Sequence, residues 1–190
     1  MKDEENAIKT DLSLYNNESY RPGAGRVKRA AWFIINVCFF LNPLIPFYGI
    51  KVFLLRLFGA RVGRGVVIKP SVNIKYPWNL IVGDHVWIGE KAWIDNLAKV
   101  SIGGHVCISQ GAMLICGNHD FSKRTFDLMT GEICLEDGAW IGAGAMVGPG
   151  VKVGSHAVLS LGSAATADLQ PYTIYRGNPA EIIKKRTINP

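Results

Sequence analysis

Aliphatic residues recur at every sixth position along most of the chain, from Val62 to Leu159. Two extra residues follow Ile74 and again Ile94, and one interruption of fifteen residues runs from 120 to 134. A period of six fits neither an α-helix nor the simple alternation of a β-strand. The aliphatic positions are Val62, Ile68, Ile74, Val82, Ile88, Ile94, Ile102, Ile108, Leu114, Leu135, Ile141, Val147, Val153 and Leu159.

This repeat predicts an all-β fold, a parallel β-helix built from hexapeptide units. Each unit forms one short strand and a turn, and three units close one triangular coil with the aliphatic residue pointing inward. Stacking the coils at the strand spacing of ~4.8 Å turns every repeated position into a column. The glycines that follow many aliphatic residues suit turns with unusual backbone angles, and the two ends of such a stack need caps.

An apolar segment, residues 30–58, precedes the repeat. Its first twenty-one residues carry no charged side chain, which is close to the ~20 residues that a membrane span requires. Pro43 and Pro46 interrupt the segment and predict two helices, over about residues 30–41 and 47–58. We expect these helices to cap the first coil, and the alternatives are a monotopic membrane contact and a true membrane span.

These patterns divide the chain into three parts. Residues 1–60 form a polar lead, which we expect to be poorly ordered at its start, followed by the apolar helical cap. Residues 61–176 form the β-helix, and the interruption of the repeat is a loop over residues 120–134. Residues 177–190 form a tail, in which two isoleucines followed by basic residues predict a short C-terminal helix.

The composition indicates a folded protein with a basic surface. Of the 190 residues, 48% are hydrophobic and 19% are charged, so the chain is not disordered. The net charge of +6 could serve nucleic acid, anionic lipid or a phosphorylated cofactor, or only solvate the surface. We expect no nucleic-acid partner. The N-terminus is unlike a secretory signal, and the four cysteines form no CxxC pair, so we expect reduced thiols in a cytoplasmic protein.

One of the four histidines is set apart by its place in the repeat. His85, His105 and His156 each fall three places after an aliphatic residue, at a turn that accepts polar side chains. His119 instead falls five places after Leu114, immediately before the interruption. A neutral imidazole is a competent general base near neutral pH. His119 is therefore our candidate catalytic residue.

Other chemistries have weaker support in the sequence. His85 and His105 would lie one coil apart in the same column and could share a metal ion, but no third ligand is visible, so we expect no metal site. The cysteines carry no partner signature of a nucleophile. A histidine base acting on a thioester would need no covalent enzyme intermediate, and backbone N–H groups of the coil turns could stabilise the oxyanion.

Several stretches of the repeat resemble a known family. Residues 62–161, with the ending 171–180, resemble the hexapeptide-repeat acetyltransferases of the maltose, galactoside and nodulation O-acetyltransferase group. The resemblance implies a left-handed β-helix, a homotrimer, and acetyl-CoA bound between two subunits. It also implies direct acetyl transfer to a sugar hydroxyl with His119 as the base. The stretches that resemble the colanic acid biosynthesis acetyltransferases more closely are residues 63–70, 93–96, 108–112 and 117–120.

The same resemblance assigns further residues by position. Asp95 and Asn96 would face the acceptor, and Trp140 would either wall the cleft or pack in the core. Ala167 and Glu181 stand where many relatives carry a basic residue, which puts cofactor affinity in question more than chemistry. The positions expected to contact the pantetheine arm, or the adenine and phosphates of the cofactor, are Ala143, Leu161, Thr166, Ala167, Arg176 and Lys184.

We therefore expect an acetyl-CoA-dependent O-acetyltransferase that acts on a saccharide in exopolysaccharide or cell-surface polysaccharide biosynthesis. Three alternatives stay open. The acceptor could be the amine of an amino sugar or xenobiotic, or the protein could be a metal-dependent hydratase of the carbonic anhydrase type. It could also be a non-catalytic scaffold or membrane-docking protein that uses residues 30–58.

Overall fold

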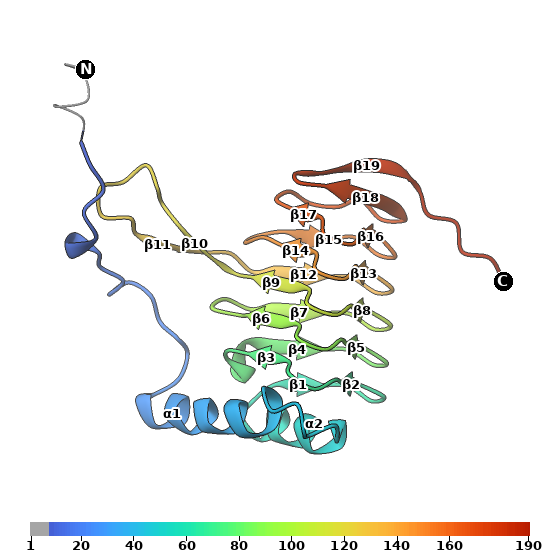
Figure 1. Cartoon of the computed structure of the whole chain (residues 1–190), viewed down its shortest axis with the longest axis horizontal. Coiled ribbons are helices and arrows are strands. Elements are labelled where there is room, and N and C mark those ends of the chain that lie inside the picture. Colours follow the sequence, from blue (N-terminus) through green and yellow to red (C-terminus); the bar gives the residue numbers. More distant parts are fainter. Residues whose placement is uncertain (1–7) are drawn as a thin grey trace.

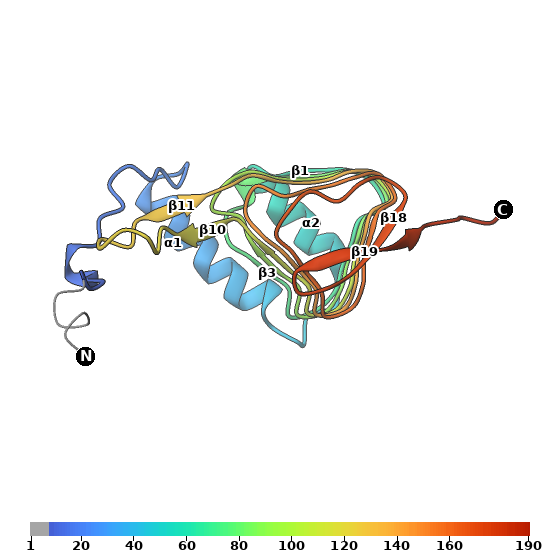
Figure 2. The same cartoon turned by 90° about the horizontal axis from the view of Figure 1, so that it is seen from above.

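The computed structural model describes residues 8–190, and its main part is a stack of parallel coils (Figure 1). Seen along the stack, the coils superpose as a rounded triangle (Figure 2). Each coil adds one short strand to each of three sheets, and strands one coil apart pair in parallel register. This arrangement confirms the predicted β-helix.

From residue 61 to residue 165, leaving aside a hairpin at the side, the strands follow one another in rotation among the three sheets. The first sheet contains β1 (Arg61–Val62), β4 (Leu80–Val82), β7 (Val100–Ile102), β12 (Ile133–Leu135) and β15 (Lys152–Val153). The second contains β2 (Val67–Ile68), β5 (Trp87–Ile88), β8 (Cys107–Ile108), β13 (Trp140–Ile141), β16 (Val158–Leu159), β18 (Thr173–Gly177) and β19 (Ala180–Lys185). The third contains β3 (Asn73–Ile74), β6 (Trp93–Asp95), β9 (Met113–Ile115), β14 (Met146–Val147) and β17 (Ala164–Ala165).

The aliphatic residue of each repeat points into the coil, as predicted. Val62, in the first coil, is partly exposed, and the other thirteen repeat positions are buried. A second buried column runs four places later in the repeat, for example at Val66, Ala92 and Ala145. Burying one aliphatic side chain contributes about 1.5–3 kcal/mol. The continuous columns are therefore the main source of stability in the stack.

The repeated histidines lie at turns of the stack, as their position in the repeat predicts. His85, His105 and His156 have φ angles of 56°, 57° and 57°, in the left-handed region. The backbone N–H of each histidine donates to the coil before it; that of His105, for example, lies 2.8 Å from the Asp84 carbonyl oxygen. The rings of His85 and His105 stack with their centroids 5.2 Å apart.

Two short helices close the first coil. Helix α1 (Arg26–Ile35) continues into one π-helical turn, η2 (Asn36–Phe40), and α2 (Tyr48–Leu57) follows a linker that contains Pro43 and Pro46. The break at the prolines is confirmed, although the first helix begins four residues earlier than predicted. Within residues 8–190, no helix has the length and apolar character needed to cross a membrane.

The inner faces of the helices pack against the first coil. Trp32 is 2% exposed, and its Nε1 donates to the carbonyl oxygen of Ile74 at 2.8 Å. Lys51 is also buried, with its Nζ 2.9 Å from the carbonyl oxygen of Lys69. Burial lowers the pKa of Lys51. The helices are thus fixed to the coil by specific polar contacts as well as by apolar packing.

The C-terminal segment forms a strand, so the predicted terminal helix is wrong. β19 pairs antiparallel with β18, which itself extends the second sheet by pairing with β16. Tyr175 lies opposite Ile182, and Arg176 opposite Glu181. The physical reason is that β18 would otherwise present an open edge, and the isoleucine-rich tail completes its hydrogen bonding.

The interruption of the repeat is a β-hairpin that projects from the side of the stack (Figure 1). β10 (Gly117–His119) pairs antiparallel with β11 (Leu128–Thr130). The chain then rejoins the coils at β12, which lies beside β7. Because the hairpin leaves and returns at adjacent coils, the stack continues in register across it.

The polar lead runs along this hairpin from residue 8, and the expectation of poor order at its start concerns residues 1–7, which lie outside the described part of the chain. A 3-10 turn, η1 (Leu12–Leu14), follows Asp11. The backbone N–H of Asp11 donates to the carbonyl oxygen of Arg124 at 2.9 Å, and their side chains form an ion pair at 3.0 Å. The lead and the hairpin therefore form one unit beside the coils.

Candidate active site

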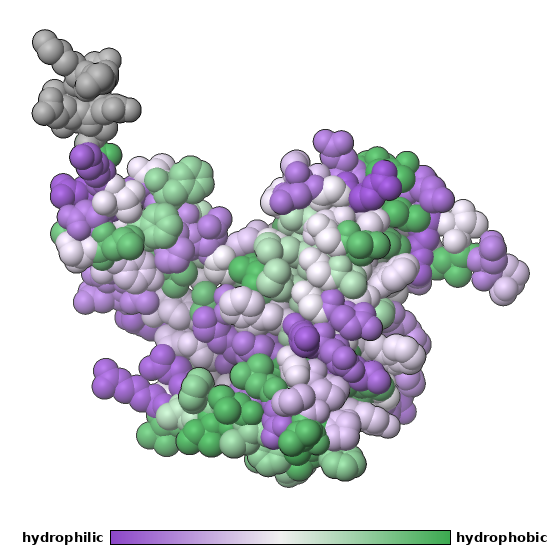
Figure 3. Space-filling view, in the orientation of Figure 1, coloured by the Kyte–Doolittle hydropathy of each residue, from purple (hydrophilic) through white to green (hydrophobic). Residues whose placement is uncertain are grey.

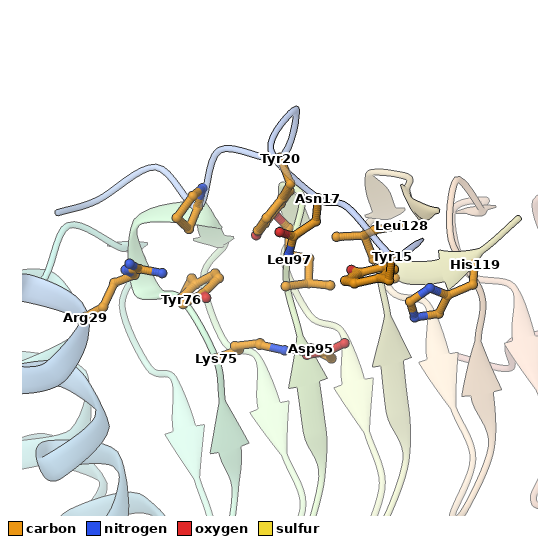
Figure 4. A pocket seen from close by; sticks show the side chains of 12 residues that line it. Tyr15, Asn17, Tyr20, Arg29, Lys75, Tyr76, Asp95, Leu97, His119 and Leu128 are labelled. Carbon is orange, nitrogen blue, oxygen red and sulfur yellow. Dashed lines mark hydrogen bonds and ion pairs between the residues drawn. The ribbon is translucent and has the colours of Figure 1, made fainter. Parts of the chain in front are cut away.

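His119 lies in a cavity of about 560 Å³ where the hairpin, the polar lead and the coils meet (Figure 4). The coils supply the floor, the hairpin and the lead supply two walls, and α1 closes one end. The lining residues are Tyr15, Asn17, Tyr20, Pro22, Arg29, Lys75, Tyr76, Asp95, Leu97, Gly117, His119 and Leu128.

The imidazole of His119 is oriented by the tip of the hairpin. Its Nδ1 lies 2.9 Å from the carbonyl oxygen of Phe126. A carbonyl only accepts hydrogen bonds, so Nδ1 carries the proton and Nε2 of the neutral ring keeps its lone pair. The Phe126 ring stacks on the imidazole at 4.5 Å and 6°, and the Tyr15 ring lies at 5.8 Å. The arrangement holds the tautomer that a general base requires.

The backbone of Phe126 is in a conformation that a bulky residue seldom adopts. Its φ is 52°, in the left-handed region. Strained residues of this kind persist only where the surrounding structure holds them. Here the carbonyl of Phe126 is hydrogen-bonded to His119 and its ring is stacked on the same imidazole.

Asp95 lies in the floor of the same cavity. It is 7% exposed, and its Oδ1 is 2.9 Å from Nζ of Lys75, in an ion pair without the directional geometry of a hydrogen bond. Lys75 was missed in the sequence. The signal was available, because Lys75 and Asp95 are twenty residues apart, the same spacing that separates the paired residues Asn73 and Trp93.

Asn96 does not face the cavity, contrary to the expectation from the resemblance. It is fully buried, and its side-chain amide makes two hydrogen bonds with the backbone of Tyr76. Its Oδ1 accepts from the Tyr76 N–H at 2.9 Å, and its Nδ2 donates to the Tyr76 carbonyl at 2.6 Å. Asn96 therefore holds the backbone of a cavity residue in place, and its buried side chain does not line the cavity.

The polar lead contributes side chains that sequence reasoning missed. The Tyr20 hydroxyl donates to the Leu97 carbonyl at 3.0 Å, and burial raises the pKa of Tyr20 above its usual value. Trp78 Nε1 donates to the Pro22 carbonyl at 2.6 Å. These contacts join residues far apart in the chain, and the lead has no hydrophobic period, so no pattern could locate them.

Trp140, Ala143 and Leu161 come together in a different cavity, of about 520 Å³. None of its lining residues lines the His119 cavity. Trp140 is 46% exposed and its Nε1 donates to Oγ of Ser109 at 2.9 Å, so it walls a cavity and does not pack in the core. One chain therefore carries the two sets of predicted site residues on separate surfaces.

The other predicted cofactor positions lie near the C-terminal end of the stack. Thr166 and Ala167 are exposed and follow β17, while Arg176 and Lys184 are exposed on β18 and β19. Arg186 was missed by the sequence analysis. It lines the cavity of Trp140, and its Nη1 donates to the carbonyl oxygens of Gly138 and His156, both at 3.0 Å.

Neither thiolate nor metal chemistry has geometric support near His119. Cys116 is buried at the base of the hairpin, and burial raises the pKa of its thiol to about 11, so it stays protonated at neutral pH. Across residues 8–190, no three His, Cys, Asp or Glu side chains gather in a group that could hold a metal ion.

No model of a known protein family matches the chain, but individual known proteins are similar to it. The chain is 35% identical over 176 residues to WcaF of Escherichia coli, named as a colanic acid biosynthesis acetyltransferase; the match covers 93% of this chain and 97% of WcaF.

Solved structures share the fold. The hexapeptide-repeat acetyltransferase VCA0836 of Vibrio cholerae, complexed with acetyl-CoA, superposes with a TM-score of 0.77 at 19% identity, covering 93% of this chain and 97% of that one. A galactoside acetyltransferase in complex with coenzyme A superposes with a TM-score of 0.74 at 23% identity, covering 85% and 82%.

Proposed function

The chain belongs to the hexapeptide-repeat acetyltransferases, and we propose that it transfers the acetyl group of acetyl-CoA to a hydroxyl of a saccharide. The observation that carries the proposal is the contact between His119 Nδ1 and the Phe126 carbonyl, because it leaves Nε2 as a base inside a polar cavity. The similarity to WcaF over almost its full length supports a role in exopolysaccharide or cell-surface polysaccharide biosynthesis.

In the proposed reaction, His119 moves one proton. Nε2 takes the proton of the acceptor hydroxyl while the hydroxyl oxygen attacks the carbonyl carbon of the thioester. The imidazolium then gives that proton to the departing CoA sulfur. The imidazolium is stabilised because its Nδ1–H already donates to Phe126. Asp95 and Lys75 offer an acceptor and a donor for neighbouring sugar hydroxyls. Backbone N–H groups of the coil turns stabilise the oxyanion.

The cofactor has a separate place in this proposal. The cavity of Trp140, Ala143 and Leu161 takes the pantetheine arm, Thr166 and Ala167 contact it through their backbone, and the phosphates and adenine lie near the exposed basic end of the stack. Because this surface shares no residue with the His119 cavity, a complete site needs the surface of a second copy, as in a homotrimer. The basic residues of that end are Arg176, Lys184, Lys185 and Arg186.

The proposed location is the cytoplasm, next to the inner face of the membrane. The saccharide acceptor, the histidine base, the trimer and the location form a single proposal. The acetyl transfer itself can be tested separately from the trimer and the location.

The test is an acceptor screen with purified protein and acetyl-CoA. Release of the CoA thiol is followed by absorbance, and acetylated products are identified by mass spectrometry for a panel of neutral sugars, oligosaccharides and amino sugars. For the accepted sugar we expect His119→Ala to lower kcat/KM by about 10²–10⁴ with an unchanged unfolding midpoint, because general-base catalysis contributes that much.

The matched control replaces a turn histidine. His105→Asn should keep full activity, since asparagine tolerates the left-handed backbone of that turn and the ring lies outside the cavity. Activity of His119→Ala within a few-fold of the native enzyme would overturn the assignment of the base, and acetylation of amino sugars alone would replace the hydroxyl acceptor by an amine.

A further inference from the structure

The outer face of the N-terminal helices and their linker is apolar. Figure 3 shows hydrophobic residues gathered at the base of the molecule, over α1 and α2. We call this surface the basal face and define it by the exposed apolar side chains of this segment. They are Val27, Phe33, Ile34, Val37, Leu41, Leu44, Phe47, Tyr48, Ile50, Phe53 and Leu57.

The basal face has no partner within the described part of the chain. The side of the helices that the first coil needs is already occupied by Trp32, Phe40, Leu54 and Leu55, which are buried. Leu44 and Phe53 are nevertheless 81% and 62% exposed on the other side. A helix that is apolar on two sides is expected to have apolar surroundings on both, and contiguous apolar patches on soluble proteins mark interaction sites.

The charge around the basal face has one sign. Between residues 21 and 83 the sequence contains ten Lys and Arg and no Asp or Glu, whereas the rest of the chain contains eleven Lys and Arg and fifteen Asp and Glu. Exposed basic residues stand at both ends of the helical segment: Arg26 and Lys28 in α1, and Arg61 in the first coil. Arg56 of α2 is also exposed, but its guanidinium donates to the carbonyl oxygens of Val62 and Gly63 in the first coil. The apolar surface therefore has a basic rim.

We propose that the basal face docks on an anionic lipid bilayer, with α1 and α2 lying in the headgroup region. Apolar side chains entering the interface and a basic rim against anionic headgroups are the two contributions that hold monotopic proteins on membranes. Neither helix could span the bilayer, so the contact is superficial. A second copy fits less well as the occupant, because two basal faces placed together would oppose basic charges of the same sign.

The docking surface is connected with the His119 cavity. A second cavity, of about 370 Å³, is lined at one end by Phe33 and Leu41 of the basal face and at the other by residues that also line the His119 cavity. Arg29 is among the shared residues, and its Nε is buried without a hydrogen-bond partner among residues 8–190. The shared residues are Arg29, Lys75, Tyr76 and Asp95.

The connection between the two cavities indicates the class of acceptor, and this assignment of the acceptor rests on the proposed function. A saccharide joined to a membrane lipid through phosphate would place its sugar near His119, its phosphate beside Arg29 and Lys75, and its apolar chain over Phe33 and Leu41. Docking would present the cavity to an acceptor that never leaves the bilayer.

Vesicle flotation of the full-length protein tests the docking. We expect the native protein to float with vesicles of phosphatidylcholine and phosphatidylglycerol in equal parts, to float at least tenfold less with phosphatidylcholine alone, and to be partly released by 1 M NaCl, where charge attraction is screened. The double variant Leu44→Glu/Phe53→Glu should lose at least tenfold in vesicle binding. The control Ile188→Glu replaces an apolar residue that is 54% exposed in the C-terminal tail and should bind normally.

Circular dichroism and the unfolding midpoint establish that each variant is folded. Failure of the native protein to bind the anionic vesicles, or equal binding by the folded double variant, would overturn the proposal. A native particle mass that halves in the double variant would assign the basal face to a second copy instead. Acetyl transfer to water-soluble acceptors should be unchanged in the double variant, so a failure of docking and a failure of the proposed function give different results.

Discussion

The coils and the hairpin with its polar lead are held together in different ways. Each coil is bonded to its neighbours by parallel backbone pairing and by continuous columns of buried aliphatic side chains. The hairpin has one antiparallel pairing of three residues per strand, and the lead is attached to it by an ion pair, a backbone hydrogen bond and the ring of Tyr15. The stable region contains the repeated turn histidines, and the lightly held region contains His119.

The difference shows how this fold separates stability from chemistry. A residue inside a coil must pack against both the coil above and the coil below, so both neighbours restrict which side chain fits there. A residue in the hairpin or the lead meets only a few side chains and can be aimed at a substrate. Paired substitutions, one in each region, test how complete that separation is.

The largest difference in stability is expected between a leucine of the coils and a leucine of the hairpin. Leu114 is fully buried in a coil, whereas Leu128 lies partly exposed on the hairpin and lines the cavity. Leu114→Ala should lower the free energy of unfolding by about 2–5 kcal/mol through the lost contacts and the space left behind. Leu128→Ala should cost less than about 1 kcal/mol, because surface positions contribute little. Denaturant titration measures both, and equal losses would show that the hairpin shares the stability of the coils.

A smaller difference is expected for two glycines. A Cβ on Gly89 would lie 2.7 Å from the backbone nitrogen of Gln110 in the next coil, whereas a Cβ on Gly117 would lie 2.7 Å from the flexible end of Leu97. Gly89→Ala should destabilise the protein by about 1–3 kcal/mol, because the coils cannot separate locally.

Gly117→Ala should instead leave the unfolding midpoint nearly unchanged and raise the acceptor KM several-fold, because Leu97 is pushed within the cavity. Calorimetry and steady-state kinetics on the two variants separate these effects. An unchanged KM in Gly117→Ala would mean that this wall of the cavity does not contact the acceptor.

The smallest effect is expected where the lead meets the hairpin. Asp11→Asn removes the ion pair with Arg124 but keeps the backbone hydrogen bond, and exposed ion pairs contribute little. We expect no change in the unfolding midpoint and about a threefold rise in acceptor KM, because Tyr15 is held less firmly beside His119. The control Lys123→Gln removes an ion pair with Asp127 inside the hairpin and should leave KM unchanged.

The contact between Asp11 and Arg124 should depend on pH. Hydrogen bonds from Ser13, together with the Arg124 charge, hold the pKa of Asp11 below its usual value. A carboxyl with a lowered pKa in the folded state keeps its contact above that pKa and loses it as the pH falls through it. The KM difference between the native enzyme and Asp11→Asn should therefore persist at neutral pH and vanish only in acid; a difference that disappears near pH 7 would assign it to another group.

The sequence predicted what repeats. The columns, the turns of His85 and His105 and the break at Pro43 all follow from spacing or from a local backbone rule, and each is present in the structure. Because spacing also places residues one coil apart in contact, it could have revealed the pair of Lys75 and Asp95.

What could not be predicted depends on contacts that occur once. The hairpin strands, the orientation of His119 by Phe126 and the return of the lead across the cavity involve no period. The two corrections have the same origin. The C-terminal strand exists because β18 needed a partner, and Asn96 is buried because a neighbouring coil required its amide.

The two ends of the stack limit how this protein can assemble. A solenoid with bare terminal coils could grow without limit, each copy extending the sheets of the next into a fibre. Here α2 packs against β1 and β2 at one end, and the antiparallel β19 covers β18 at the other. End-to-end growth of the stack is thus hindered where α2 covers the first coil and where β19 covers β18.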